Sequence, residues 1–319
     1  MLGESHGECV GVLIDGCPAG IPLTIEDFLG DLERRRSGAK GTTPRKESDT
    51  PIIKSGVFNG HTTGAPILIL FENQNTQSKD YDRLKIVPRP GHADLVAKQK
   101  FGGWNDHRGG GHFSGRLTTG VVAAGVVAKK IITPSEIRAT LVEVGGSTEI
   151  ESVIDQALQE GDSLGGIVEC RVSNVPASLG EPFFDSAESL LAHAVFSIPA
   201  IKGIEFGSGF QAAKMKGSQH NDNILSLDGK TETNHAGGIN GGITNGNQVV
   251  FRIAVKPTSS IKKEKRSIDT TTGEQVNISV EGRHDACIAL RVPPVLEAVA
   301  ALVFADLMLI EQKVSRVRR

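Results

Sequence analysis

Short glycine-rich turns punctuate this 319-residue chain from end to end and limit how long any helix or strand can be. The 38 glycines and 14 prolines follow no period and cluster in short runs, such as Gly109–Gly111 and AGGINGGITNG at 236–246. Glycine permits tight turns and left-handed backbone, and proline ends helices. This punctuation is typical of a loop-rich α/β or α+β enzyme.

Between the turns, hydrophobic patterns predict a series of strands and helices. β-Branched runs predict strands at 10–14, 52–57, 65–71, 166–172 and 249–255. Helical periodicity predicts helices after Thr24, at 117–132, near 153–158, at 184–197, and from Pro293 or Pro294 past Leu309. Thr24 would cap the first of these, with Asp27 in place of the glutamate of a capping box. No linker or internal repeat interrupts the pattern, so we expect one compact domain over residues 1–319.

Charge and composition exclude several classes of protein. The 35 basic and 37 acidic residues give a net charge of −2, which leaves no global footprint for nucleic acid or an anionic membrane. The four cysteines lack metal-like spacing and suit a reduced cytosolic protein. The longest apolar runs, at 121–128 and 298–305, are far shorter than the roughly 20 residues of a membrane helix. We expect a cytoplasmic protein with no bound metal.

The segment from Arg89 to Arg116 gathers the side chains best suited to chemistry. Its three histidines, at positions 92, 107 and 112, can carry a proton near neutral pH, while its three arginines stay charged. The triple glycine within it lets a backbone press against a flat or phosphorylated ligand, because no Cβ intervenes. The segment therefore indicates a site that binds an anion and moves protons beside it.

Three other places offer candidates, each with a plain structural alternative. His6 lies in GESHG and His92 in RPGHAD, where Ser5 and Asp94 could orient an imidazole, although most histidines are structural. In GRHDAC, Asp285 beside a cation could be an ion pair or an ionised base. KPTSS suits phosphate or flavin oxygens, or is an ordinary strand-end turn. A Walker loop and a dinucleotide GxGxxG are both absent.

Eleven ordered motifs make the sequence resemble the chorismate synthases. They are GESHG, IDGCPAG, RRRSG, TTPR, RPGHAD, DHRGGGHFSGR, SLGEPFFD, SIPAIKG, TNHAGGINGGITNG, KPTSS and GRHD. Their order and spacing fit over nearly the whole chain, which is far more specific than any single motif. The resemblance implies an α+β fold, a single large β-α-β sandwich-like domain, assembled as a homotetramer.

The resemblance also implies a reaction. It is the anti-1,4-elimination of phosphate from 5-enolpyruvylshikimate 3-phosphate to give chorismate, in the shikimate pathway to aromatic amino acids. No side-chain base can remove the unactivated hydrogen directly, so reduced FMN is required without net redox change. NADPH would act only as the reductant of the flavin, and a separate flavin reductase is a possible partner.

Residue roles carry over from the matching motifs. His6 and His92 match family histidines that protonate the departing phosphate and the reduced flavin, and which does which stays open. Ser5 and Ser114 match proton-relaying hydroxyls, and Asp285 matches the aspartate that serves flavin N5.

Ligand contacts carry over in the same way. The arginines that would hold the substrate's phosphate and two carboxylates are Arg35, Arg45, Arg116 and Arg283. The positions that match flavin contacts are Arg35, His112, Phe113, Ser114, Pro199, Ala200, Gly241, Lys256, Pro257, Thr258, Ser259, Ser260 and Arg283. For the arginines at 34–36, a solvated helix end is the alternative.

The chain departs from the family pattern at two places, the pair His112–Phe113 and Gly41. His112 and Phe113 stand where many members have RS or RA, and Gly41 stands near the second arginine linked with NADPH, beside Lys40. The second departure weakens any expectation of intrinsic flavin reduction. Two alternatives stay open, an NADPH-dependent flavin reductase and a non-catalytic flavin- or anion-binding protein.

Overall fold

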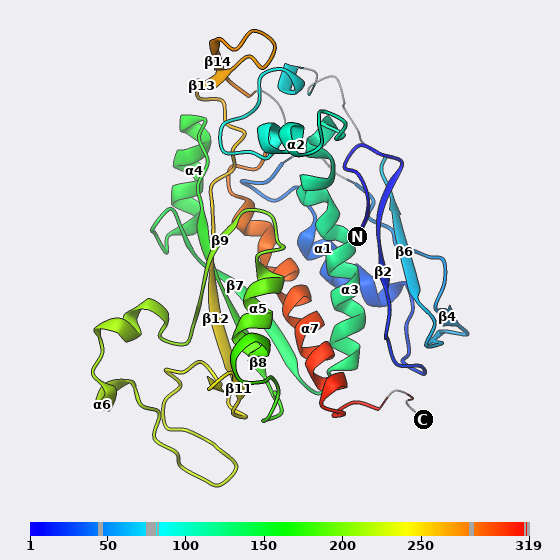
Figure 1. The fold of residues 1–319 in the computed structure, drawn as a ribbon, viewed down its shortest axis with the longest axis vertical. Coiled ribbons are helices and arrows are strands. Elements are labelled where there is room, and N and C mark those ends of the chain that lie inside the picture. The colour runs from blue at the N-terminus through cyan, green and yellow to red at the C-terminus, as the bar shows by residue number, and fades with distance from the viewer. Residues whose placement is uncertain (44–46, 75–80, 82, 281–283, 316, 318–319) are drawn as a thin grey trace.

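Two antiparallel sheets enclose a layer of helices (Figure 1). This computed structural model describes residues 1–43, 47–74, 81, 83–280, 284–315 and 317. The three layers confirm the expected α+β fold with a β-α-β sandwich.

The first sheet has the strand order β1-β2-β6-β3, from β1 (Leu2–Gly3), β2 (Cys9–Ile14), β6 (Ile67–Glu72) and β3 (Ile52–Ile53). Alternate residues face the helices, so Val10 lies opposite Phe71, and both are buried. The predicted strand at 52–57 was wrong in its length. The backbone turns at Gly56, whose φ is +80°, and a separate hairpin of β4 (Val57–Phe58) and β5 (His61–Thr62) follows.

The second sheet has the order β7-β8-β12-β9, from β7 (Glu136–Val144), β8 (Gly166–Ser173), β12 (Val249–Val255) and β9 (Ile201–Phe206). Phe251 in β12 lies between Cys170 and Phe206 of its two neighbours. One face of this sheet packs on the helices, and the alternation in β8 and β12 confirms the predicted strands there.

The helical layer contains α1 (Glu26–Arg35), α3 (Thr118–Ile131), α5 (Ala187–Val195) and α7 (Val292–Ile310). Helix α3 packs on β2 and β6, helix α7 packs on β7 and β8, and the two helices pack on each other. A Cβ atom added to Gly125 would lie 2.2 Å from Cβ and 2.4 Å from Cα of Ala298. The missing side chain therefore sets how closely α3 approaches α7.

The remaining elements lie around this sandwich. They are α2 (Asp94–Lys100), α4 (Ile150–Glu160), α6 (Gly217–His220), β10 (Ile239–Asn240), β11 (Ile243–Thr244), β13 (Lys265–Ile268) and β14 (Gln275–Ile278). The chain around α6 forms an arm that extends from the body of the molecule (Figure 1).

Two predicted helix starts were early, one by a single residue and one by three residues. Helix α1 begins at Glu26, and Asp27 accepts the backbone N–H of Thr24 at 2.8 Å, which is one half of the expected capping box. The helix predicted at 184–197 is preceded by a short 3-10 turn at Phe183–Asp185, and α5 starts directly after Ser186. The Ser186 hydroxyl accepts the backbone N–H of Ser189 and caps α5.

The stretch Ile288–Ile310 is long and apolar enough, by length and composition, to cross a membrane. The sequence did not show this length as one uninterrupted apolar run, because Glu297 and Asp306 divide it. Sixty-seven per cent of its most apolar window is buried inside the protein. Its position between both sheets is that of a core helix.

The contrast between two helical glycines tests the packing of this layer. Gly125→Ala should lower the free energy of unfolding by at least about 2 kcal/mol, because the new methyl group meets the backbone of α7. Gly30→Ala in α1 meets nothing within 4 Å and should raise it by up to about 1 kcal/mol through helix propensity. Urea unfolding of both variants at one protein concentration checks this. Equal effects would contradict the close helix contact.

Candidate active site

A cavity of about 960 Å³ lies where three helices of the central layer end. Thr118 brings the N-terminus of α3 to its wall, Val292 brings that of α7, and Arg35 brings the C-terminus of α1. Helix N-termini carry partial positive charge and favour anions. The volume is at the upper end for small-molecule sites.

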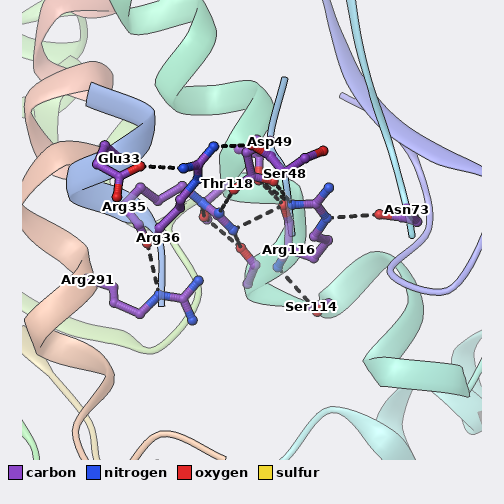
Figure 2. A network of polar contacts seen from close by, with 12 residues as sticks. Glu33, Arg35, Arg36, Ser48, Asp49, Asn73, Ser114, Arg116, Thr118 and Arg291 are labelled. Atoms are coloured by element: carbon purple, nitrogen blue, oxygen red, sulfur yellow. Dashed lines mark hydrogen bonds and ion pairs between the residues drawn. The ribbon is translucent and has the colours of Figure 1, made fainter. Parts of the chain in front are cut away.

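Arg35 enters this cavity wall as a buried side chain that is largely satisfied from within the protein (Figure 2). Its Nε donates to Thr118 Oγ1 at 3.0 Å, its Nη1 to Asp49 Oδ2 at 3.1 Å, and its Nη2 to Gly115 O at 3.2 Å. Burial and the nearby charge of Arg291 lower the pKa of Arg35, and Asp49 opposes them. The buried cation therefore depends on its carboxylate partner.

Arg116 shares that partner. Its Nη1 pairs with Asp49 Oδ1, its Nε donates to Asn73 Oδ1 at 2.9 Å, and its Nη2 donates to Glu72 O at 3.3 Å (Figure 2). Asp49 is almost fully buried and joins Arg35 to Arg116. Most donors of both guanidinium groups are thus engaged, so neither has a free fork for bidentate binding of an anion.

The other two arginines of the RRR motif turn to different partners. Arg34 donates to both carboxylate oxygens of Glu297, at 2.8 and 2.7 Å, and Lys129 adds a third bond to Glu297 at 2.8 Å. Arg36 pairs with Glu33 and donates to the carbonyl oxygen of Ser48. Of the three arginines only Arg35 is buried. For Arg34 and Arg36, whose side chains are partly exposed, the alternative of a solvated helix end fits better than a place in an anion site.

The triple glycine brings the two candidate histidines to one loop. Gly109, Gly110 and Gly111 all have positive φ, at 60°, 80° and 53°. A Cβ on Gly109 would lie 2.5 Å from Cδ2 of His6, and one on Gly110 would lie 3.5 Å from Cε1 of His92. A side chain at Gly109 would displace His6, while the contact of Gly110 with His92 is an ordinary van der Waals distance. The glycine at position 109 therefore allows the loop to pack against His6.

His6 and Ser5 lie behind the cavity wall rather than on it. Both are buried, and the cavity is lined instead by Gly109 and Tyr81, which contact His6. The Tyr81 ring meets the His6 ring edge-on with centroids 5.2 Å apart. His6 therefore reaches the cavity only past these two residues.

His92 lies on the wall and is held by a carboxylate and an arginine. Its Nδ1 is 2.5 Å from Asp94 Oδ1. Arg89 donates from Nε and Nη2 to the two oxygens of Asp94, both at 2.8 Å, and from Nη1 to Ser260 Oγ at 3.0 Å. Burial raises the pKa of Asp94, but the hydrogen bonds and charges of Arg89 and His92 together lower it by more. The pKa of Asp94 therefore lies well below the ordinary value. An ionised Asp94 stabilises a proton on Nδ1 of His92.

Asp285 contacts Arg291 and the backbone of Thr43. Its Oδ1 accepts the backbone N–H of Thr43 at 2.8 Å, and its Oδ2 is 3.4 Å from Nη1 of Arg291. Arg291 also donates from Nε to the carbonyl oxygen of Arg35 at 3.0 Å. Asp285 and Arg291 both line the cavity.

The residues matched to flavin contacts form a polar and an apolar part of the wall. Pro199 and Ala200 belong to the apolar part, and Phe113, Ser114 and Lys256–Ser260 also line the cavity. Lys256 Nζ donates to Gly91 O at 3.0 Å and to Ser259 Oγ at 2.8 Å. Burial and the charges of Lys202 and Lys265 lower the pKa of Lys256. An anionic group bound here would relieve that repulsion, as the phosphate of a flavin nucleotide would.

Besides His6 and Ser5, two described residues from the sequence prediction do not line this cavity. His112 points its Nδ1 at Gly3 O, 3.1 Å away, and does not line the cavity. Gly241 lies in the β10–β11 turn and does not line the cavity either. Arg45 and Arg283 lie outside the described residues.

The sequence prediction also missed residues that complete the site. These are Asp49, Tyr81, Arg89 and Arg291. Arg89 and Asp49 carried a signal, since each stands in a motif-rich segment, but Ser260, a partner of Arg89, and Arg116, a partner of Asp49, lie 171 and 67 residues away.

Comparison with known proteins gives one consistent result. The family model described as chorismate synthase matches residues 1–309. A chorismate synthase of Chitinophaga pinensis is 67% identical over 318 residues, which span 99% of this chain and 96% of that protein. One from Pyrococcus abyssi is 46% identical, over 97% of this chain and 95% of that protein. A crystal structure of chorismate synthase aligns with a TM-score of 0.74 and 28% identity, over 97% of this chain and 90% of that one.

The buried carboxylate that holds Arg34 gives a prediction about acid stability. Burial raises the pKa of Glu297, but Arg34, Lys129 and the backbone N–H of Ala139 lower it below the ordinary 4.5. Its contribution is therefore complete above about pH 4.5 and is lost as pH falls through the lower native pKa. Glu297→Gln should cost about 3–5 kcal/mol at pH 7 and less in acid.

Urea unfolding from pH 7 downward measures both effects. Glu33→Gln is the matched control, because it breaks an exposed pair with Arg36 and should cost less than about 1 kcal/mol. A Glu297→Gln deficit that stays constant in acid would contradict the assignment of a lowered pKa.

Proposed function

The chain belongs to the chorismate synthase family, carbon–oxygen lyases of the shikimate pathway to aromatic amino acids, and we propose that the cavity at the helix ends is its active site. There it would convert 5-enolpyruvylshikimate 3-phosphate to chorismate and phosphate by anti-1,4-elimination. The observation that carries this proposal is His92, held by the partly buried Asp94 at a cavity lined by arginines and two helix N-termini.

The substrate brings a phosphate and two carboxylates to this cavity. Two helix N-termini and the remaining donors of Arg35, Arg116 and Arg291 offer positive charge. Because Asp49 already engages Arg35 and Arg116, each would give the substrate a single N–H rather than a fork. Arg45 and Arg283 join this set by their match to the family motifs.

The wall also fits reduced FMN. An apolar surface at Pro199 and Ala200 suits the flavin ring, and the cationic turn Lys256–Ser260 suits its phosphate, while Phe113 and Ser114 line the same cavity. When bound, the cofactor supplies the transient electron that the elimination needs, without net redox change. His112 and Gly241 are left out of this set because neither lines the cavity.

Protons would move through His92 first. With Asp94 holding Nδ1, Nε2 can deliver a proton to the departing phosphate oxygen and later regain one. His6, with Ser5, would serve the flavin side from behind Gly109, with Ser114 as a relay at the wall. Asp285 would offer its carboxylate near flavin N5, oriented by the N–H of Thr43.

The source of reduced flavin lies outside this cavity. Gly41 occupies the position near a family arginine linked with NADPH, and a Cβ there would meet Ile154 and Leu290. Lys40 beside it pairs with Asp155 on the surface at 2.5 Å. We propose that NADPH serves only to reduce FMN, through a separate flavin reductase, in the cytoplasm.

Assembly as a homotetramer is supported by apolar side chains that the single domain leaves exposed. The most exposed are Leu227, Trp104, Phe184, Phe183, Phe210 and Ile224, and all of these except Trp104 lie near the arm or before α5. Burial of such a set between copies is a common use of large exposed apolar surface.

An anaerobic assay tests the proposed reaction. With chemically reduced FMN and 5-enolpyruvylshikimate 3-phosphate, the protein should release chorismate and phosphate in equal amounts. His92→Ala should fold normally and lower kcat by about 10²- to 10⁴-fold, because it removes the general acid. His61→Ala, on an exposed hairpin, is the control and should keep full activity.

Three outcomes separate the possibilities. Binding of both ligands without product would reject the lyase activity. NADPH consumption without phosphate release would favour a flavin reductase. Full turnover by His92→Ala would reject the role of His92 alone.

Light scattering after gel filtration tests the assembly. The native chain should elute with about four times the 33.8 kDa of one copy. Leu227→Asp should give smaller species, because it places a charge among the exposed apolar side chains. Val96→Asp on α2 is the control at another exposed apolar position. A monomeric native chain would reject the tetramer.

A further inference from the structure

Arg89 bridges the turn Lys256–Ser260 and His92. Its buried guanidinium donates from Nη1 to Ser260 Oγ at 3.0 Å, while Nε and Nη2 hold Asp94. The group is planar and rigid, so Nη1 cannot move without moving Nε and Nη2. A displacement at Ser260 is therefore transmitted to Asp94.

Nδ1 of His92 lies within reach of two partners that make opposite demands. Asp94 Oδ1 is 2.5 Å away and Arg89 Nη2 is 3.0 Å away. An ionised carboxylate only accepts, so pairing with Asp94 requires a hydrogen on Nδ1. A guanidinium only donates, so pairing with Arg89 requires a lone pair there. The ring can satisfy only one of them at a time.

The choice decides what the other ring nitrogen can do. With Nδ1–H on Asp94, Nε2 can take up a proton to form the imidazolium and give it to a phosphate oxygen, which restores the neutral ring. With Nδ1 accepting from Arg89, Nε2 carries the only ring hydrogen and can donate a hydrogen bond, but releasing that hydrogen would leave an imidazolate. Only the pairing with Asp94 supports proton transfer.

We propose that Arg89 is a positioning residue that couples occupancy of the turn Lys256–Ser260 to the tautomer of His92. The inference rests on the proposed function, because it takes this turn to hold flavin and His92 to move a proton. A ligand at Ser260 draws the guanidinium toward the turn and takes Nη2 away from Nδ1. His92 is then left with Asp94, in the form that transfers protons.

Nitrogen-15 NMR of the histidine rings tests the bridge without any ligand. Ser260→Ala removes one partner of Arg89, and Arg89→Lys removes the fork. Both should change the difference between the Nδ1 and Nε2 shifts of His92. Ser163→Ala is the matched control, since its hydroxyl bonds the carbonyl of Thr258 in the same turn at 2.8 Å without touching Arg89. It should leave the His92 shifts unchanged.

Addition of oxidised FMN then tests the coupling, with binding followed by flavin fluorescence. In the native protein and in Ser163→Ala, FMN should move His92 toward the Nδ1–H form. In Ser260→Ala and Arg89→Lys the response should be much smaller, although FMN still binds.

The two arms separate the inference from the function on which it rests. Unchanged His92 shifts in ligand-free Ser260→Ala and Arg89→Lys would overturn the bridge. An equal FMN response in all four proteins would overturn the coupling. Failure of FMN to bind the native protein would reject the proposed cofactor and the coupling to it, and would leave the bridge to stand on the ligand-free arm.

Discussion

The close contact between α3 and α7 is the constraint on which the rest of the structure depends. Gly125 meets the Ala298 backbone, and each helix covers one of the two sheets. The helices run side by side in the central layer (Figure 1), and the cavity lies at their N-termini. The contact therefore fixes both the spacing of the sheets and the distance between Arg116, before α3, and Arg291, before α7. A packing requirement in the core thus becomes a geometric requirement at the site.

Buried carboxylates balance the cations around this cavity. Asp49 holds Arg35 and Arg116, Glu297 holds Arg34 and Lys129, and Asp94 holds Arg89, at distances typical of charge-assisted bonds. Each arginine is thereby fixed before a ligand arrives, which limits the entropy lost on binding. The attraction that remains for an anionic substrate comes from the helix N-termini and from the remaining donors of Arg35, Arg116 and Arg291. Lys256, whose pKa is lowered by burial and by its positive neighbours, lies in the turn matched to the flavin.

The parts of the fold that sequence could predict are those in which one local rule decides the outcome. β-Branched runs predicted the strands at 10–14, 166–172 and 249–255, and burial alternates along the last two because one face of their sheet is buried. The prediction at 52–57 failed because the strand ends at Ile53 and the backbone turns at Gly56 before a separate hairpin. In the site, the motifs predicted His92 and Arg116. The role of Asp49 could not be predicted, because its two arginines lie 14 and 67 residues away in a polar loop context.

The two histidines differ in how the structure exposes them, and this difference bears on their roles. His92 lies on the wall with its Nδ1 side held by Asp94, so its Nε2 can meet a ligand oxygen directly. His6 is buried behind Gly109 and Tyr81, and a proton leaving it must pass the loop backbone or a hydroxyl. The geometry therefore gives His92 direct access to a bound ligand and gives His6 only an indirect path to it.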